Sequence, residues 1–240
     1  MIPVIYENNE IMIVNKPAGI SSQGGERVSR SLDEMLSLQT GRKIFLVHRL
    51  DKETSGLMIV AKDSSSAAKW IRLIAQNAVK KEYTAVCFGA PTLNNREIQS
   101  GMISLPILKN GKFQSAKTSF SVKKSVLLAC PKEGGGAADL KKGDIFLKHG
   151  EKQIRFSIIN FVLLTGRTHQ IRIHAAKSGF PVAGDDKYGD FYLNKLAKKH
   201  FFVKGLQLAA TKLTLNVKGK SPLEFKIEPE ENMRSVLNLL

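Results

Sequence analysis

Cysteines and long apolar runs are scarce in this chain of 240 residues. Its two cysteines, Cys87 and Cys130, lie far apart, and neither has a CxxC partner or a histidine at zinc-finger spacing. This pattern excludes a disulfide framework and a structural zinc site, and it indicates the reducing cytoplasm. The most apolar run, Phe156 to Leu164, is far shorter than the roughly 18 residues of a membrane span, and the N-terminus lacks the pattern of a secretory signal. We therefore expect a cytoplasmic protein without a membrane partner.

The fingerprints of several enzyme classes are also missing. There is no GxxxxGK[ST] or GxGxxG, as nucleotide-binding loops have, and no HExxH or GxSxG, as zinc peptidases and serine hydrolases have. His169 and His174 are five residues apart, whereas metal ligands on one helix face need a spacing of three or four. Asp185 and Asp186 form a lone acidic pair, which is more typical of a turn or a cap than of a magnesium site. The sequence thus predicts no metal and no cofactor.

Positive charge, in contrast, is in large excess. Lysine and arginine number 37 against 21 acidic residues, which leaves a formal net charge of +16. Such a surplus suits a polyanionic partner, either nucleic acid or an anionic membrane surface, although it also promotes plain solubility. No basic tract stands on an amphipathic helix, so nucleic acid is the favoured partner. Nothing in the sequence indicates an oligomer, and a monomer is expected.

The apolar periodicity mixes strands with scattered helices and so predicts an α+β fold rather than a regular series of βαβ units. Helix patterns occupy 64–76, 169–177 and 230–239, and Ser31 with Glu34 has the spacing of a capping box before a further short helix. Thr168 is expected to cap the helix at 169–177. Residues 131–143, which include three consecutive glycines, are expected to be a loop or an insertion. Strand patterns occupy 4–6, 11–14, 44–47, 57–61, 81–88, 116–122, 153–164, 205–217 and 223–227.

Two segments carry polar residues more densely than a core needs. They are HRLDKETSG at 48–56 and TGRTHQIRIH at 165–174, and each follows an apolar strand that can present loop residues rigidly. Asp51 in the first segment could simply pair with an arginine and hold the loop in place. Alternatively, a carboxylate beside guanidinium groups has a lowered pKa, stays ionised at neutral pH and suits a nucleophile. The residues alone leave both readings open.

The first segment, together with LMIVAKD after it, closely resembles the catalytic loop of the RluA family of pseudouridine synthases. The motifs DDKYGD and PILKN are similar to those of the subgroup named ribosomal large subunit pseudouridine synthase C. The resemblance runs over essentially the whole chain, and it implies a mixed, largely antiparallel central sheet with helices and loops around an RNA-binding cleft. Further segments resemble the family in the family's own order, namely VNKPAG, KKEYTAV, TGRTHQIRIHAAKSGFPVAGDDKYGD and LQLAATKLTL.

The resemblance implies roles for single residues. Asp51 matches the family's essential aspartate, Tyr83 its active-site tyrosine, and Arg172 the basic residue that pairs with the aspartate. Arg49 matches a residue that takes the place of the flipped-out base. The same motifs imply an RNA-contacting group that includes an apolar residue lining the pocket, Leu208, together with His48, Arg167, His169 and Gln170.

The implied reaction converts uridine to pseudouridine without metal or redox cofactor. It breaks the N-glycosidic bond, rotates the uracil and rejoins it through carbon. A carboxylate can attack the sugar or the base, or remove a ribose proton, and the sequence does not choose among these. Arg49 could offset part of the cost of unstacking the base, or only contact a phosphate. Tyr83 could stack on uracil and transfer a proton, or be a core residue of its strand.

We expect one catalytic domain over residues 1–240, without a separate N-terminal S4-like RNA-binding domain. Its expected substrate is 23S ribosomal RNA. The missing S4-like segment, which fits either a compact natural form or a catalytic fragment, keeps transfer RNA open. The family often has histidine-alanine where this chain has Ala209-Ala210, so a histidine role at that place is absent or replaced. The rivals are a non-catalytic RNA-binding protein on the same scaffold and, less favoured because no ligand cluster exists, a metal-dependent RNA hydrolase.

Overall fold

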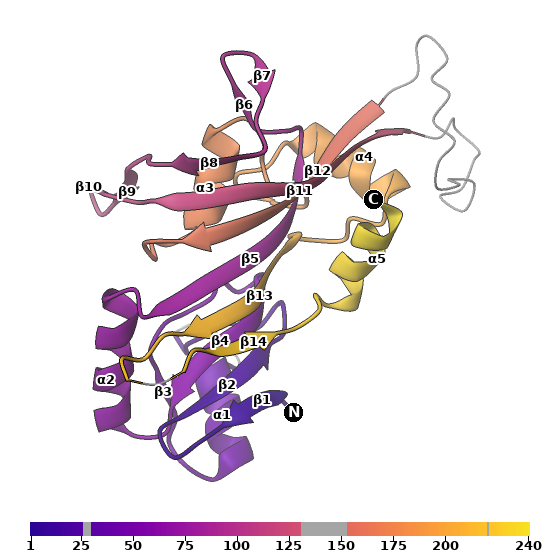
Figure 1. The fold of residues 1–240 in the computed structure, drawn as a ribbon. Coiled ribbons are helices and arrows are strands. Elements are labelled where there is room, and N and C mark those ends of the chain that lie inside the picture. The colour runs from indigo at the N-terminus through magenta and orange to yellow at the C-terminus, as the bar shows by residue number, and fades with distance from the viewer. Residues whose placement is uncertain (26–29, 131–152, 220) are drawn as a thin grey trace. The chain divides into compact units, whose positions relative to one another are not determined.

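A computed structural model describes the positions of four stretches of the chain: residues 1–25, 30–130, 153–219 and 221–240. They contain strands that pair mostly antiparallel, with a few helices beside them, which confirms the predicted α+β class (Figure 1). The glycine-rich stretch expected to be a loop or insertion lies outside the described residues. The described chain forms two compact units, Met1–Tyr83 with Ala209–Glu230 and Thr84–Leu208 with Glu231–Leu240.

The first unit is built on strands in the order β1-β2-β4-β13. In addition, β3 pairs with β4 and β14 pairs with β13, both antiparallel. The pairing of β4 with β13 is parallel, whereas β1 with β2 and β2 with β4 are antiparallel. The strands and helices are β1 (Val4–Glu7), β2 (Ile11–Lys16), α1 (Leu32–Thr40), β3 (Phe45–Leu46), β4 (Ser55–Ala61), α2 (Ser64–Ala75), β13 (Leu208–Leu215) and β14 (Leu223–Lys226).

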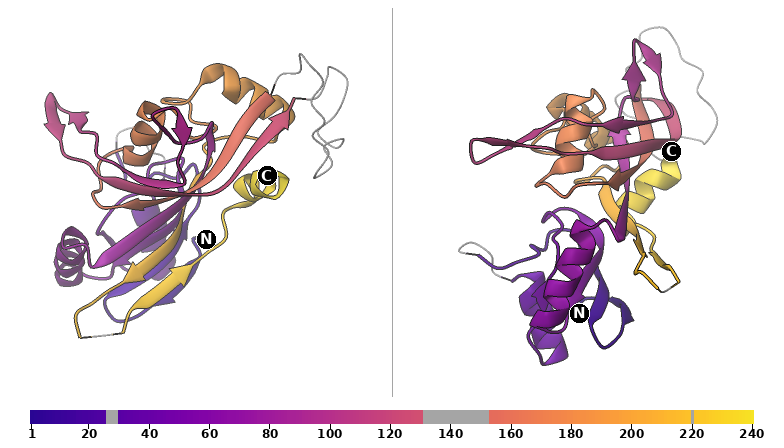
Figure 2. Two further views of the ribbon diagram at one scale, coloured as in Figure 1. Left: turned by 45° about the horizontal axis from the view of Figure 1, so that its top comes forward. Right: turned by 60° about the vertical axis from the view of Figure 1, so that its left-hand side comes forward.

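The core of this unit forms between the sheet and α2, which lies against β3 and β4 (Figures 1 and 2). Alternate residues of the central strands point to this side, and Trp70 of α2 is buried against them. Every residue of β4 is buried, because a strand in the middle of a covered sheet has no solvent-facing side. The predicted helix after Ser31 is confirmed as α1, where the Glu34 carboxylate accepts a hydrogen bond from the backbone N–H of Ser31.

Gly56 permits the close parallel pairing of β4 with β13. It lies opposite Ala210, its φ is +118°, and a Cβ placed on it would lie 2.3 Å from the Ala210 carbonyl oxygen. Only glycine combines this dihedral with such a close approach of another backbone. The backbone geometry therefore explains why the last residue of the HRLDKETSG segment, Gly56, is a glycine.

The Gly56→Ala variant should lose about 2–3 kcal/mol of unfolding free energy, because the methyl group meets backbone atoms and the dihedral is strained. Urea unfolding followed by circular dichroism measures this loss. Gly41→Ala is the matched control, since Gly41 also has a positive φ of 67° but has nothing within 4 Å of the place that an added methyl group would take. It should lose only about 1 kcal/mol. Equal losses at both positions would show that strain alone matters.

The second unit contains the β5 residues from Thr84 onward, followed in space by β12, β11 and β8. The pairs β11–β12 and β11–β8 are antiparallel (Figure 2). Aromatic rings fill its core, with Phe156 in contact with both Phe88 and Phe201. The elements are β5 (Val79–Phe88), β6 (Thr92–Leu93), β7 (Arg96–Glu97), β8 (Ser100–Ile103), β9 (Ile107–Lys109), β10 (Lys112–Gln114), β11 (Thr118–Ala129), β12 (Gln153–Leu163), α3 (Gln170–Lys177), α4 (Phe191–His200) and α5 (Glu231–Leu239).

Candidate functional site

A buried lysine organises the loop that carries Asp51. Lys16 ends the apolar strand β2, and its side chain has no solvent exposure. Its ammonium group donates hydrogen bonds to the carbonyl oxygens of Pro17 (2.9 Å), Ile20 (2.8 Å) and Lys52 (3.0 Å). All three donors of the ammonium are thereby satisfied, as a buried charge requires. Lys16 thus ties the VNKPAG segment to the residue that directly follows Asp51.

Burial lowers the pKa of Lys16 from 10.5 to about 8, while the carboxylates of Glu230, Glu53 and Asp51 act in the opposite direction. The ammonium form therefore prevails at neutral pH. Sequence reasoning did not place Lys16 in the site. A lysine at the end of an otherwise apolar strand, inside a segment that resembles the family, was the available signal.

Further hydrogen bonds hold the same loop on both sides of Asp51. The Ser22 hydroxyl donates to the Leu50 carbonyl (2.7 Å) and accepts from the Leu50 N–H (3.1 Å). After Asp51, the backbone N–H of Thr54 donates to the Asp51 carbonyl at 3.1 Å. Asp51 itself is partly exposed and Arg49 is exposed, so the rigid loop presents both side chains outward.

Tyr83 lies close enough to Asp51 to feel its charge. The tyrosine is 5% exposed, and its pKa is raised above the usual value, first by burial and second by the negative charge of Asp51. Its hydroxyl therefore stays protonated and can act as a hydrogen-bond donor. Two of the three predicted catalytic residues are thus brought together within the first unit.

His48 has a structural partner. Its Nε2 atom accepts a hydrogen bond from the backbone N–H of Ile59 at 3.0 Å, which joins the start of the loop to β4. Burial, assisted by the positive charge of Lys81, lowers the pKa of His48 to about 3, so the ring is neutral. The neutral ring, with its Nε2 atom bonded to β4, helps to hold the loop in place. The RNA contact expected of His48 stays a prediction.

The second polar segment leads into α3, but Thr168 does not cap this helix as expected. The N-cap is His169, with a left-handed φ of 54°. Gln170 takes over the local hydrogen bonding: its Oε1 accepts from the Arg167 N–H (3.0 Å) and from the Thr165 hydroxyl (2.8 Å), and its Nε2 donates to Thr118. Because Gln170 is 3% exposed and its amide is used on both ends, it is a structural residue of this turn. Its RNA contact stays a prediction.

Arg172 is buried and forms a bidentate pair with Asp185. Its Nε and Nη2 atoms donate to the two Asp185 oxygens at 2.7 and 2.6 Å, and Nη2 also reaches Asp186 at 3.3 Å. Asp185 also accepts from the backbone N–H groups of Lys187 and Tyr188, which confirms the turn interpretation of this acidic pair. Burial alone would raise the pKa of Asp185, but these hydrogen bonds outweigh it and hold the pKa below 3.8. The pairing of Arg172 with Asp51 stays a prediction.

Asp185→Ala should cost about 3 kcal/mol of unfolding free energy, because it leaves the Arg172 guanidinium without its bidentate partner inside the protein. Chemical denaturation at pH 7 measures the loss. The difference from the wild type should shrink as the pH falls below 3.8, since the lowered pKa of Asp185 supplies stability only while the carboxyl is ionised. Asp186→Ala is the control: its side chain is 88% exposed, and its loss should stay below about 1 kcal/mol. Equal losses would contradict the assignment.

Tyr188 joins two predicted residues of this unit, His169 and Arg172, into one cluster. Its hydroxyl lies 3.0 Å from Nδ1 of His169, and the two rings meet edge to face. The Arg172 guanidinium lies over the same ring, 5.3 Å from its centroid. Sequence reasoning quoted DDKYGD but did not single out this tyrosine.

The remaining two predicted positions differ in exposure. Arg167 is exposed, and its Nε donates to the carbonyl of Ser115 at 3.1 Å. Leu208, at the start of β13, is 4% exposed. The side chain of Arg167 is therefore accessible to a ligand. The role expected of Leu208, to line the pocket, stays a prediction.

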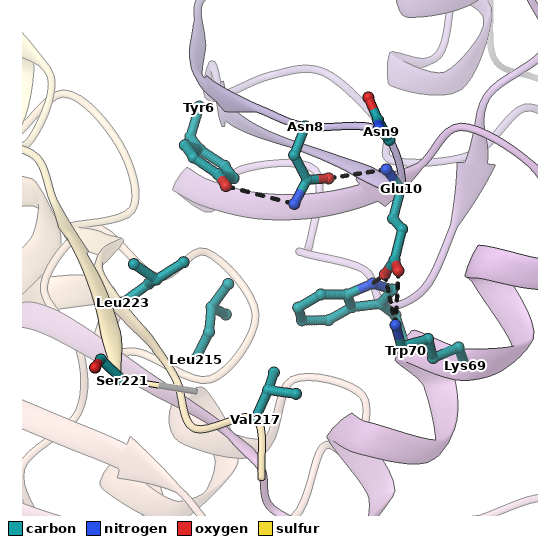
Figure 3. Close-up of a pocket in the computed structure, with 10 residues that line it drawn as sticks. All are labelled: Tyr6, Asn8, Asn9, Glu10, Lys69, Trp70, Leu215, Val217, Ser221 and Leu223. Atoms are coloured by element: carbon teal, nitrogen blue, oxygen red, sulfur yellow. Dashed lines mark hydrogen bonds and ion pairs between the residues drawn. The ribbon is translucent and has the colours of Figure 1, made fainter. Parts of the chain in front are cut away.

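A cavity of about 370 Å³ in the first unit is lined by other residues (Figure 3). The Glu10 carboxylate on its wall accepts hydrogen bonds from Lys69 Nζ (2.7 Å) and Trp70 Nε1 (3.0 Å), so these polar groups satisfy one another. None of the predicted site residues is among the ten that Figure 3 labels as lining it. We assign this cavity no part in the site.

Two features are absent from the described residues. No group of three or more histidine, cysteine, aspartate or glutamate side chains gathers there as a metal site would require. Within the same residues, no helix is both long enough and apolar enough to cross a membrane.

Comparison with known proteins agrees with the motifs. Residues 10–177 match the profile of the family described as RNA pseudouridylate synthase. Ribosomal large subunit pseudouridine synthase C of Rickettsia bellii (strain RML369-C) is 34% identical over 209 residues, which cover 82% of this chain and 60% of that protein. The enzyme of the same name from Rickettsia felis (strain ATCC VR-1525 / URRWXCal2) is 33% identical over 236 residues, covering 92% of this chain and 68% of the relative. The chain thus spans about three fifths of the length of the first of these relatives.

Solved structures show the same fold. Human RNA Pseudouridylate Synthase Domain Containing 4 superposes with a TM-score of 0.68 at 21% identity, covering 99% of this chain and 92% of that one. Human RNA Pseudouridylate Synthase Domain Containing 1 gives a TM-score of 0.69 at 20% identity, covering 100% and 87%. At these identities the likeness concerns the fold alone.

Proposed function

Because this chain belongs to the RNA pseudouridylate synthase family, we propose that it isomerises uridine to pseudouridine in RNA with Asp51 as the nucleophile. The observation that carries the proposal is the loop around Asp51. Lys16 and Ser22 hold its backbone, while the Asp51 side chain remains partly exposed beside Tyr83. A carboxylate on a rigid loop is preorganised for attack, because little conformational freedom is lost when the substrate arrives.

The remaining residues receive supporting roles in this proposal. The exposed guanidinium of Arg49 enters the RNA stack where the target uridine leaves it, and so offsets part of the unstacking cost of about a few kcal/mol. The protonated hydroxyl of Tyr83 faces the uracil and moves a proton at the base. Attack at the sugar and attack at the base both place the Asp51 carboxylate against the flipped nucleotide, so the roles hold for either path.

The proposed substrate is 23S ribosomal RNA, acted on in the cytoplasm. The support is the name of the relatives, ribosomal large subunit pseudouridine synthase C, at 33–34% identity. Transfer RNA is the alternative substrate of the same chemistry, and the two are separated by the choice of RNA in the assay.

The deciding experiment uses RNA labelled with tritium at carbon 5 of uridine. Carbon 5 loses its hydrogen when it becomes the attachment point of the sugar, so each pseudouridine formed releases one label to water. Parallel reactions contain 23S ribosomal RNA or transfer RNA from cells that lack the gene. We expect release from the ribosomal RNA and intact strands in chelator. Bound RNA without release would make the protein a non-catalytic binder, and chelator-sensitive strand cleavage would make it a hydrolase.

A further inference from the structure

Helix α4 and the two residues that follow it carry aromatic rings and lysines in an exposed row. Phe191, Lys195, Lys198 and Phe202 are all exposed, with Phe191 at 85% and Phe202 at 47%. Spacings of four and three residues bring the first three side chains to one face of the helix, and Phe202 follows just beyond its end. We call these four residues the α4 row. The helix buries its opposite side, where Ala197 is fully buried, whereas the row faces solvent, mostly at Phe191 and by about half at Phe202.

The charge of this region has one sign. Between Lys187 and Lys204 the sequence has five lysines and a single carboxylate, that of Asp190. Asp190 caps α4 by accepting a hydrogen bond from the Leu193 N–H at 2.8 Å, so its charge is used at the helix N-terminus. A surface of this composition is complementary to a chain of phosphates.

The conformation of Phe202 adds an independent observation. Its φ is +59°, a left-handed dihedral that glycine or asparagine usually supplies at the end of a helix. A bulky residue is disfavoured there by about 1–2 kcal/mol. Burial of the ring offsets this only in part, because nearly half of the side chain faces solvent. Strain retained at an exposed aromatic residue is typical of a binding surface.

We propose that the α4 row binds a single-stranded segment of the substrate RNA, with the two phenylalanine rings stacking on bases and the two lysines contacting phosphates. The helix from Phe191 to His200 alone rises about 14 Å, a length that suits a few nucleotides. Unpaired bases stack on aromatic side chains without regard to sequence, and lysines between the rings meet the backbone. The inference rests on the proposed function only in that the ligand is RNA.

The affinity test compares the full chain with the double variant Phe191→Ala/Phe202→Asn. Asparagine tolerates the left-handed dihedral, so folding is preserved while the ring is lost. We expect the Kd for a fluorescein-labelled oligouridylate to rise by about tenfold or more, since stacking on an aromatic side chain contributes measurably for each base. In the tritium assay KM should rise while kcat at saturating RNA is unchanged. Leu38→Ala is the control, because Leu38 on α1 is 84% exposed and has no lysine row beside it.

The lysines are tested by salt dependence. For Lys195→Gln/Lys198→Gln, the slope of log Kobs against log salt should fall in magnitude by about 1.4, that is about 0.7 for each phosphate contact to a single strand. The control Lys226→Gln, at an exposed lysine of β14, should leave the slope unchanged. A slope equal to that of the wild type in the double variant would overturn the phosphate contacts.

A direct readout is photocrosslinking to oligouridylate that contains 5-iodouridine, which joins a base to a stacked aromatic ring. We expect a crosslinked peptide containing Phe191 or Phe202, and its loss in the double variant. The inference would be overturned if the wild type crosslinked only at other residues and the double variant bound with an unchanged Kd. The α4 row would then be assigned to a protein partner. The two proposals fail separately: tritium release with unaltered binding by the variants refutes only the α4 row, whereas weakened binding by the variants without any tritium release refutes only the isomerisation.

Discussion

Replacing Asp51 by asparagine should abolish tritium release, with a loss of at least about 10⁴-fold in kcat at saturating RNA. The amide has the size of the carboxylate but lacks its negative charge, so it neither attacks carbon nor accepts a proton. The loop should keep its shape, because Ser22 and Lys16 bind backbone carbonyls rather than the Asp51 side chain. RNA affinity and the midpoint of thermal unfolding should therefore stay close to those of the wild type.

The matched control is Glu53→Gln, which changes an exposed carboxylate two residues further along the same loop. It should retain nearly all activity. Single-turnover measurements with excess enzyme separate the chemical step from product release. Residual activity above about a tenth of wild type in the Asp51 variant would move the nucleophile to another residue while leaving the family assignment intact.

The second large effect is expected for Lys16→Met. The substitution keeps an unbranched side chain of similar length but leaves the carbonyls of Pro17, Ile20 and Lys52 without their donor. Each buried acceptor left unsatisfied costs about 1–3 kcal/mol, and removing a buried charge offsets part of this, so we expect a net loss of about 4 kcal/mol. Urea unfolding measures the loss. At a temperature where the variant is folded, kcat should fall more than about tenfold, because Asp51 is no longer held in place.

The pH dependence identifies the lysine as the cause. Its folded-state pKa of about 8 lies below the ordinary 10.5, so the unfolded chain binds more protons between these values. Wild-type stability therefore gains a rising contribution from Lys16 as the pH increases from 8 towards 10.5, and Lys16→Met should lack it. Lys69→Met is the control, since Lys69 is 45% exposed in a surface ion pair with Glu10 and should lose under about 1 kcal/mol. Identical pH profiles for Lys16→Met and wild type would contradict the assignment.

The elements that could be predicted from the sequence are those with strong periodicity or clear capping. The hairpins β1–β2 and β13–β14 and helices α1, α2 and α5 were expected, and their ends agree within a few residues. Helix α4 was missed, because its exposed face carries Phe191 and several lysines and so blurs the apolar stripe. The aspartate N-cap followed by Leu193, Leu196 and Ala197 was the signal that remained. The hairpins β6–β7 and β9–β10 are too short for any periodic pattern.

The sequence predicted the position of Asp51 correctly but not the cap of α3. The motifs placed Asp51 on a loop between strands, and the structure has it between β3 and β4. Thr168 was expected as a cap because threonine favours that position, but Gln170 makes the local hydrogen bonds instead. Propensity describes a residue alone, whereas here the N-cap is His169, whose side chain makes no capping hydrogen bond, and Gln170 binds the turn that precedes the helix.

By itself, the sequence determined the α+β class and the family, and it favoured nucleic acid as the partner. These conclusions rest on residue type and spacing alone, and so they do not depend on the folded structure. They use the net charge of +16, the strand periodicities and the HRLDKETSG and GRTHQIR motifs. Only the tertiary structure showed what holds the loop of Asp51, that Arg172 forms a bidentate pair with Asp185, and that the α4 row is exposed. These depend on burial and on contacts between residues distant in the chain, such as Lys16 with Lys52, and such contacts leave no periodic trace in the sequence.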